Sequence, residues 1–93
     1  HCFRPFPNAP MMADGRVREA VLEARRRGVL FDVGHGMGSF AFATGRTMLA
    51  QGFLPDTISS DVHAMCLDGP AFDLLVTMTK FLALGLSLEE VVE

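Results

Sequence analysis

The sequence predicts an α/β fold with parallel strands, and two observations support this prediction. Helix-like and short strand-like segments alternate along the 93 residues as helix, strand, helix, strand and helix, with no hairpin turn between them. The hydrophobic share of 49% and the mean hydropathy of +0.30 exceed what one small core requires. Such an excess is typical of strands that helices cover on both faces, as in a parallel sheet.

The first half of the chain is predicted to contain a loop, a helix and a strand. Prolines make residues 4–10 an irregular loop. Over residues 15–27, apolar side chains recur at helical spacing opposite a face of Arg and Glu, and Gly28 follows as a suitable stop. The apolar segment VLFDV, residues 29–33, indicates a short buried strand.

The next part of the chain repeats this order. Ser39 is a suitable N-cap for a helix over residues 40–51, and Gly52 is placed to end it. The segment TIS, residues 57–59, is the second short strand. Because two short strands cannot form a stable sheet alone, we expect further strands beside them.

The last third is predicted to hold an apolar helix over residues 70–84 and the start of another helix. Pro70 suits the first turn of the apolar helix, and Gly85 suits its end. Ser87 and Glu90 have the spacing of a capping box, which predicts that a further helix begins there.

The composition narrows the class of protein. A formal net charge of −3 argues against a nucleic-acid partner, and no apolar run approaches the roughly 20 residues of a membrane span. The N-terminal residues lack the zones of a signal peptide, and two cysteines make neither a disulfide framework nor a metal knuckle. We therefore expect a cytoplasmic protein, cut from a longer chain, without nucleic-acid or membrane partners; an oligomer is compatible with the sequence.

Ionisable residues gather in the two loops that follow the predicted strands. We name residues 34–39 the glycine loop and residues 60–69 the pocket loop. His35 stands in the first loop, and Asp61 and His63 stand two residues apart in the second, so they share one face if the chain stays extended. An aspartate and two histidines suit a metal-dependent hydrolase. By spacing alone, a turn aspartate with surface or hydrogen-bonded histidines explains them equally well.

Three glycines in five residues let another group come close to the glycine loop. One reading is a substrate that approaches the backbone while His35 offers a hydrogen-bond donor. The alternative is a small α/β module that binds an anion or phosphate without catalysis, because Gly34, Gly36 and Gly38 precede a helix N-terminus.

Four stretches, HCF, GVLFDVGHGMGSF, LPDTISSDVHAMCLDGPAFDL and TKFLALGLSLEEVV, cover nearly the whole chain. Together they resemble the C-terminal third of the amidohydrolase/deacetylase family, metal-dependent hydrolases related to dihydroorotases. The resemblance implies a (β/α)₈ TIM-type barrel, a fold that normally takes roughly 250 residues. Residues 1–93 would then be a partial barrel domain, holding the end of strand six and strands seven and eight with their helices.

The resemblance also implies a role for each site residue. His1 would ligate one of two metal ions, usually zinc with another divalent metal as the alternative. Asp61 would bind the other ion and act as general base and acid. His35 and Gly36 would contact the substrate, and His63 would border its pocket. The remaining ligands of the family, histidines and a carboxylated lysine, would lie upstream of His1, so the isolated piece is expected to be inactive.

The activity implied by the resemblance is hydrolysis of an amide or ester bond. The substrate would be a small N-acyl, O-acyl or cyclic amide molecule attacked by a metal-activated hydroxide. The sequence does not identify which of these molecules is the substrate.

Overall fold

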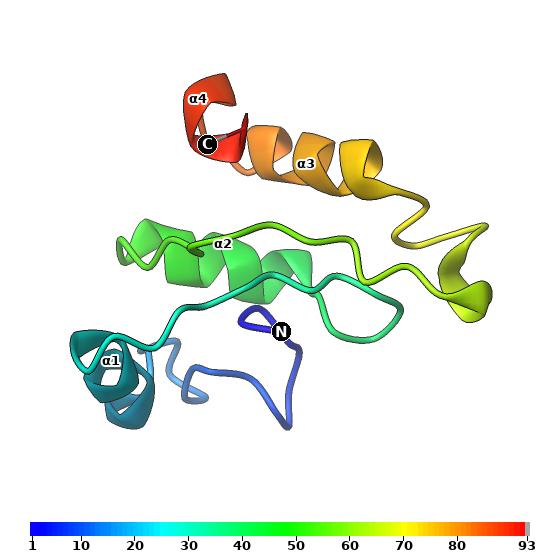
Figure 1. Ribbon diagram of the computed structural model, residues 1–93. Coiled ribbons are helices and arrows are strands. Elements are labelled where there is room, and N and C mark those ends of the chain that lie inside the picture. Colours follow the sequence, from blue (N-terminus) through cyan, green and yellow to red (C-terminus); the bar gives the residue numbers. More distant parts are fainter. Residues whose placement is uncertain (93) are drawn as a thin grey trace.

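Two extended segments run side by side through the middle of the molecule, and the helices lie around them (Figure 1). The computed structural model describes residues 1–92. The helices in this range are α1 (Glu19–Arg26), α2 (Phe42–Ala50), the 3₁₀ helix η1 (Ala64–Cys66), α3 (Leu74–Ala83) and α4 (Leu88–Val92). Helices α3 and α4 lie together beyond the second extended segment, and α2 overlaps the extended pair in this view (Figure 1). A Cβ on Gly45 of α2 would lie 3.4 Å from the side chain of Leu84, so α2 also approaches the end of α3. The observed order of helices and extended segments is that of a small α/β arrangement.

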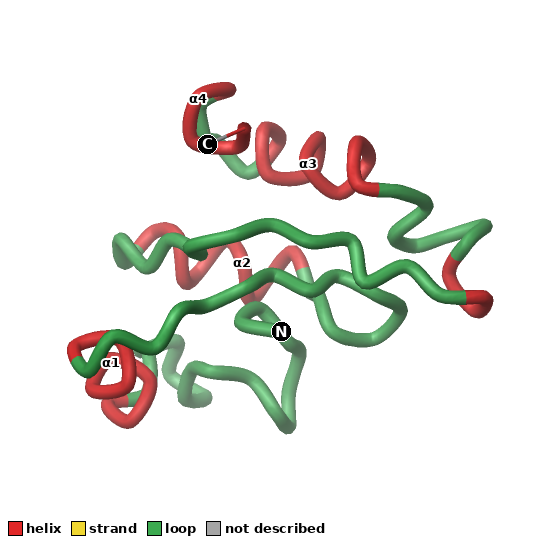
Figure 2. Tube along the Cα trace, in the orientation of Figure 1, coloured by secondary structure: helices red, strands yellow, loops and turns green. Residues whose placement is uncertain are grey.

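The extended segments are parallel neighbours, as predicted for residues 29–33 and 57–59. Asp32 and Thr57 form a parallel bridge, and the amide of Val33 donates to the carbonyl of Thr57 at 3.1 Å. In the described part of the chain the pairing stops at isolated bridges, so Figure 2 draws both segments as loop. The expected full strands are therefore not formed, because a short pair has few ladder hydrogen bonds to hold it.

Helix α1 is shorter than the predicted helix over residues 15–27. Val17 pairs with Met11 in an antiparallel bridge, and Arg18 is extended with φ −61° and ψ 135°. Val17 is buried in this bridge, so its agreement with the helical period was misleading. The end of the helix was predicted correctly, because Gly28 follows it with φ +90°.

The start of α2 was also predicted incorrectly. Its N-cap position is Ala41, which makes no side-chain cap, and Ser39 takes no part in capping. The amide of Ala41 instead donates to the carbonyl of Phe3 at 3.0 Å, which ties this helix start to the N-terminal segment. Gly52 lies just beyond the helix with φ +78°, in agreement with its predicted role.

Helix α3 begins at Leu74 and not at Pro70. The side chain of Asp73 accepts a hydrogen bond of 2.8 Å from the amide of Val76 and caps the helix. Pro70 therefore lies outside the helix, in the chain that leads to it. Gly85, with φ +104°, follows the end of α3 as predicted.

The predicted capping box before α4 is confirmed. The amide of Ser87 donates to the Glu90 carboxylate at 2.7 Å, and the amide of Glu90 donates to the Ser87 hydroxyl at 3.1 Å. These reciprocal bonds satisfy two amides that a helix start leaves without partners.

The core lies between the extended pair, the N-terminal segment and the helices. The rings of Phe3 and Phe81 stack with centroids 5.9 Å apart, which joins the N-terminal segment to α3. The buried core consists of Cys2, Phe3, Ala9, Met11, Val17, Val33, Met48, Phe53, Phe81 and Val91. Among the described residues, no helix has the length and apolar character to cross a membrane.

Expressed by itself, the 93-residue chain is expected to be poorly soluble or molten. Several large apolar side chains are exposed, with Leu30 at 76%, Leu75 at 72% and Leu88 at 66%. Exposed apolar surface of this kind favours association and loose packing. Thermal unfolding and a two-dimensional NMR spectrum test this expectation. A sharp cooperative transition with dispersed amide signals from a monomer would contradict it.

Candidate active site

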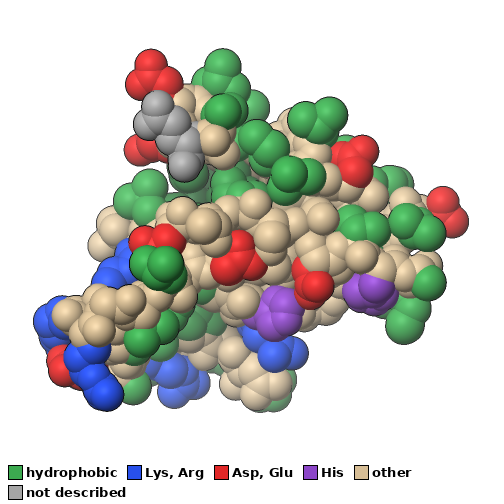
Figure 3. Space-filling view, in the orientation of Figure 1, with side chains coloured by type: hydrophobic (Ala, Val, Ile, Leu, Met, Phe, Trp, Pro, Cys, Tyr) green, Lys and Arg blue, Asp and Glu red, His purple; other side chains and the backbone are tan. Residues whose placement is uncertain are grey.

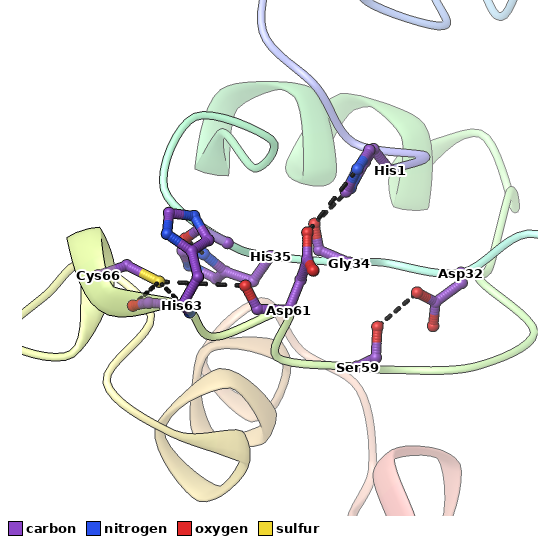
Figure 4. Close-up of polar contacts among 9 residues, drawn as sticks. His1, Asp32, Gly34, His35, Ser59, Asp61, His63 and Cys66 are labelled. Atoms are coloured by element: carbon purple, nitrogen blue, oxygen red, sulfur yellow. Dashed lines mark hydrogen bonds and ion pairs between the residues drawn. The ribbon is translucent and has the colours of Figure 1, made fainter.

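The carboxyl ends of the two extended segments lie next to each other, as the sequence predicted. The amide of His35 donates to the carbonyl of Ser59 at 3.1 Å, and the amide of Gly36 donates to that of Ser60 at 2.7 Å. Asp61 follows directly, so the glycine loop and Asp61 share one rim of the molecule (Figure 4). The predicted adjacency of His35 and Asp61 along the backbone is confirmed.

His1 and Asp61 form a pair at this rim. Nε2 of His1 lies 3.8 Å from Oδ2 of Asp61, and 41% and 53% of the two side chains are exposed. Nδ1 of His1 lies 2.7 Å from the carbonyl oxygen of Gly34 (Figure 4). Since a carbonyl only accepts, a neutral His1 carries its proton on Nδ1 and turns the lone pair of Nε2 toward Asp61.

The glycines of this loop make room for the two side chains of the pair. A Cβ atom on Gly34 would lie 2.6 Å from Nδ1 of His1, and one on Gly36 would lie 3.2 Å from Oδ2 of Asp61. Both glycines also have positive φ, +51° and +52°. The groups that come close to the glycine loop in this structure are therefore His1 and Asp61.

The donors present fit part of a metal site. Nε2 of His1 and Oδ2 of Asp61 are 3.8 Å apart, which matches the spacing of about 3.5–4 Å between the ions of a two-metal site, so each atom can serve as a ligand of a different ion. The contact of Nδ1 with Gly34 matches the way ligating histidines are usually held by a backbone carbonyl. In residues 1–92 there is no group of three or more His, Cys, Asp or Glu side chains arranged to hold a metal. The pair therefore supplies two donors and needs others to complete a site.

His35 points inward and does not project from the rim as expected. Its side chain is 1% exposed and stacks on Phe40 with ring centroids 4.8 Å apart. Nδ1 lies 2.8 Å from the carbonyl of Gly36, and Nε2 lies 2.7 Å from Nζ of Lys80. Burial, together with the nearby Lys80 ammonium, lowers the pKa of His35. Because both ring nitrogens have partners inside the protein, this conformation offers no donor to a substrate.

The expected shared face of Asp61 and His63 is absent, because the chain does not stay extended. Asp61 has φ +48°, in the left-handed region. His63 then precedes η1, and its Nδ1 accepts a hydrogen bond of 3.3 Å from the amide of Met65. The amide of His63 donates to Sγ of Cys66 at 3.2 Å (Figure 4). His63 is exposed on the pocket loop, where it was predicted to border a pocket.

Two backbone amides of the glycine loop are also occupied. The amides of His35 and Gly36 both donate to the second extended segment, and the carbonyl of Gly36 faces Nδ1 of His35. At the start of α2, the amide of Ala41 donates to Phe3. An anion-binding loop needs free amides that converge on its ligand, and the amides of His35, Gly36 and Ala41 are not free for this purpose. The amide of Gly36 is therefore occupied, and its carbonyl already accepts one hydrogen bond.

Sequence reasoning missed Asp32 and Lys80. Asp32 accepts a hydrogen bond of 2.7 Å from the Thr57 hydroxyl through Oδ1, and one from the Ser59 hydroxyl through Oδ2 (Figure 4). These bonds join the two extended segments just before the rim. The signal for both residues was a lone charge within an apolar segment, VLFDV for Asp32 and TKFLAL for Lys80.

Both cysteines are expected to resist alkylation in the folded protein. Cys2 and Cys66 are free and buried, as is typical of cysteines that pack in a core. Burial raises the pKa of the Cys2 thiol to about 11, so little reactive thiolate exists near neutral pH. Mass spectrometry after iodoacetamide treatment at pH 8 should find both thiols unmodified until denaturant is added. Rapid labelling of native Cys2 would contradict this expectation.

Histidine and carboxylate side chains lie near one another on the face of the molecule shown in Figure 3. The exposed fractions of His1 and Asp61 agree with such a surface position. This position makes the pair accessible to a group or a segment approaching from outside the chain.

The chain is similar to curated deacetylases over its whole length. It is 34% identical to a deacetylase of Agrobacterium fabrum and 32% identical to one of Brucella anthropi, in each case over 93 residues and 23% of the relative's length. A deacetylase of Enterococcus faecalis is 34% identical over 95 residues and is covered to 26%. The chain thus spans about a quarter of the curated relatives it matches. No family model matches it.

Two solved structures are also similar to this chain over all or nearly all of its length. An adenine deaminase superposes with a TM-score of 0.91 and 32% identity, over 98% of this chain and 25% of that one. A dihydroorotase superposes with a TM-score of 0.83 and 34% identity, over 100% and 25%. The chain is therefore a relative of the deacetylases and of these amidohydrolase-superfamily structures, and it corresponds to about a quarter of their length.

Proposed function

We propose that this chain is part of a metal-dependent hydrolase that cleaves an amide or ester bond in a small N-acyl, O-acyl or cyclic amide substrate. The observation that carries the proposal is the pair of His1 and Asp61, with Nε2 3.8 Å from Oδ2 and Nδ1 held by Gly34. The names of the relatives, deacetylase, adenine deaminase and dihydroorotase, support a hydrolytic reaction. The rest of the (β/α)₈ barrel would come from the remainder of a longer protein.

In this proposal His1 and Asp61 are two ligands of a binuclear zinc site, and the other ligands lie in the remainder of the protein. When bound, the metal lowers the pKa of a water molecule toward 7 and so supplies the nucleophile. His1 contributes its Nε2 lone pair, since Gly34 holds the proton on Nδ1.

Asp61 has a second role in the same proposal. Its carboxylate accepts a proton from the attacking water and returns it to the leaving nitrogen or oxygen. The exposed carboxylate is accessible to both groups, and the adjacent Gly36 has no side chain to cover it. The pocket loop, with exposed His63, borders the substrate. The side chain of His35 is buried, so it contacts other protein groups and not the substrate.

The test uses the complete protein that contains this chain. Metal content is measured by elemental analysis, and hydrolysis is assayed on N-acetyl amino acids, acyl esters and cyclic amides after loading with zinc. We expect bound zinc and turnover of at least one of these classes, with His1→Ala losing both zinc and activity. A zinc-loaded wild-type protein that hydrolyses none of them, or an unchanged His1→Ala variant, would contradict the proposal.

A further inference from the structure

Lys80 extends from α3, half-buried, toward the side chain of His35 in the glycine loop. Its Nζ lies 2.7 Å from Nε2 of His35 and 2.5 Å from the carbonyl oxygen of Pro70. Partial burial lowers the pKa of Lys80. An amine that bonds to two segments next to a candidate site suggests a role beyond packing.

The directions of these hydrogen bonds follow from the chemistry of the groups. The Lys80 ammonium can only donate, so Nε2 of His35 accepts and the ring proton is on Nδ1. Nδ1 then donates to the carbonyl of Gly36 at 2.8 Å. A continuous chain of hydrogen bonds therefore runs from Lys80 through His35 to the backbone of Gly36.

Gly36 is the residue against which the Asp61 carboxylate rests. The amide of Gly36 donates to Ser60 at 2.7 Å, and a Cβ on Gly36 would lie 3.2 Å from Oδ2 and 3.4 Å from the carbonyl oxygen of Asp61. A shift of the Gly36 backbone therefore moves the surface that supports Asp61. The backbone of Asp61 has φ +48°, a conformation that persists only where the surrounding structure holds it.

The second bond of Lys80 reaches the other loop at the same rim. The Lys80 ammonium donates to the carbonyl of Pro70, which directly follows the pocket loop. Within that loop, His63 precedes η1 and Cys66 is buried. One ammonium thus links the end of the pocket loop to the glycine loop, which come from different parts of the chain.

We propose that Lys80 is a positioning residue of the hydrolase site, which acts through His35 and Gly36 to hold Asp61 in place and through Pro70 to hold the pocket loop. The proposal rests on the proposed function for its effect on catalysis. Its effect on geometry does not depend on that function. Lys80 touches neither His1 nor Asp61 in this arrangement, so it affects the reaction only through the groups that it orients.

The experiment compares the complete zinc-loaded protein with its Lys80→Met variant, labelled with ¹⁵N in glycine and histidine. We expect the Nδ1–H form of His35 in the wild type, and a shifted Gly36 amide signal in Lys80→Met. The variant should keep its zinc while kcat falls by at least about tenfold, since small misplacements of a reacting group are costly. Thr79→Val is the matched control on the same helix, because the Thr79 hydroxyl donates only within α3, to Leu75.

Two results would overturn the proposal. One is a Lys80→Met protein with an unmoved Gly36 signal and kcat within about twofold of wild type, even if its Tm is lower. If Lys80→Met does not fold, His35→Asn and His35→Leu replace it as a pair. The asparagine side chain can still donate to Gly36, so it should retain more activity than leucine, and equal kcat values for the two would also overturn the proposal.

Failure of the proposed function is recognised separately. In that case the wild-type protein itself hydrolyses none of the three substrate classes. The Gly36 amide signal then tests by itself whether Lys80 positions Gly36. A shifted signal in Lys80→Met then supports the link from Lys80 to Gly36, and an unmoved one overturns it.

Discussion

Replacing Asp61 with asparagine in the complete protein is expected to lower kcat by at least about a hundredfold while much of the metal is retained. The amide keeps the size of the side chain and one acceptor oxygen, so the contact with Gly36 and part of the ligand function survive. It removes the basicity that proton transfer needs. Steady-state kinetics on one hydrolysed substrate and elemental analysis for zinc measure the two quantities separately.

The matched control for this variant is Asp14→Asn. Asp14 is an exposed carboxylate that bonds to Arg16 at 2.8 Å, away from the rim that carries Asp61. The same chemical change there should leave kcat and zinc content near the wild-type values. A metal-replete Asp61→Asn enzyme with near-normal kcat would remove Asp61 from the mechanism.

Replacing Gly34 with alanine is expected to displace His1 and weaken zinc binding by about 10- to 100-fold, the usual cost of losing the group that orients a ligating histidine. The new Cβ would lie 2.6 Å from Nδ1 of His1, closer than the two atoms can approach. The φ of +51° adds backbone strain of about 1–2 kcal/mol for any residue with a Cβ. Zinc titration and thermal unfolding of the complete protein measure the two effects.

Gly38→Ala makes the same chemical change in the same loop and serves as the control. A Cβ on Gly38 would meet no atom within 4 Å, and its φ lies outside the left-handed region. This variant should bind zinc like the wild type and unfold at a similar or slightly higher temperature. Equal zinc affinity of the Gly34→Ala and Gly38→Ala proteins would contradict the proposed seating of His1 on Gly34.

Local patterns in the sequence were sufficient for the ends of helices and for the neighbouring strands. Gly28, Gly52 and Gly85 each follow a helix with positive φ, and the capping box of Ser87 and Glu90 forms as expected. These features depend on residues within one turn of each other, so a linear pattern contains their physical cause. The alternation of segments likewise predicted the parallel pairing, because crossovers of this kind leave strand ends on one rim.

The tertiary structure decided the starts of α1 and α2 and the direction of the site's side chains. Val17 pairs with Met11, and His35 turns inward to meet Lys80, 45 residues further along the chain. His1 likewise rests on Gly34, 33 residues away. The sequence by itself thus determined the order of the elements, their glycine stops and the rim shared by His35 and Asp61. Which side chains face that rim depends on long-range packing and hydrogen bonds between distant segments, and a local pattern contains no information about those partners.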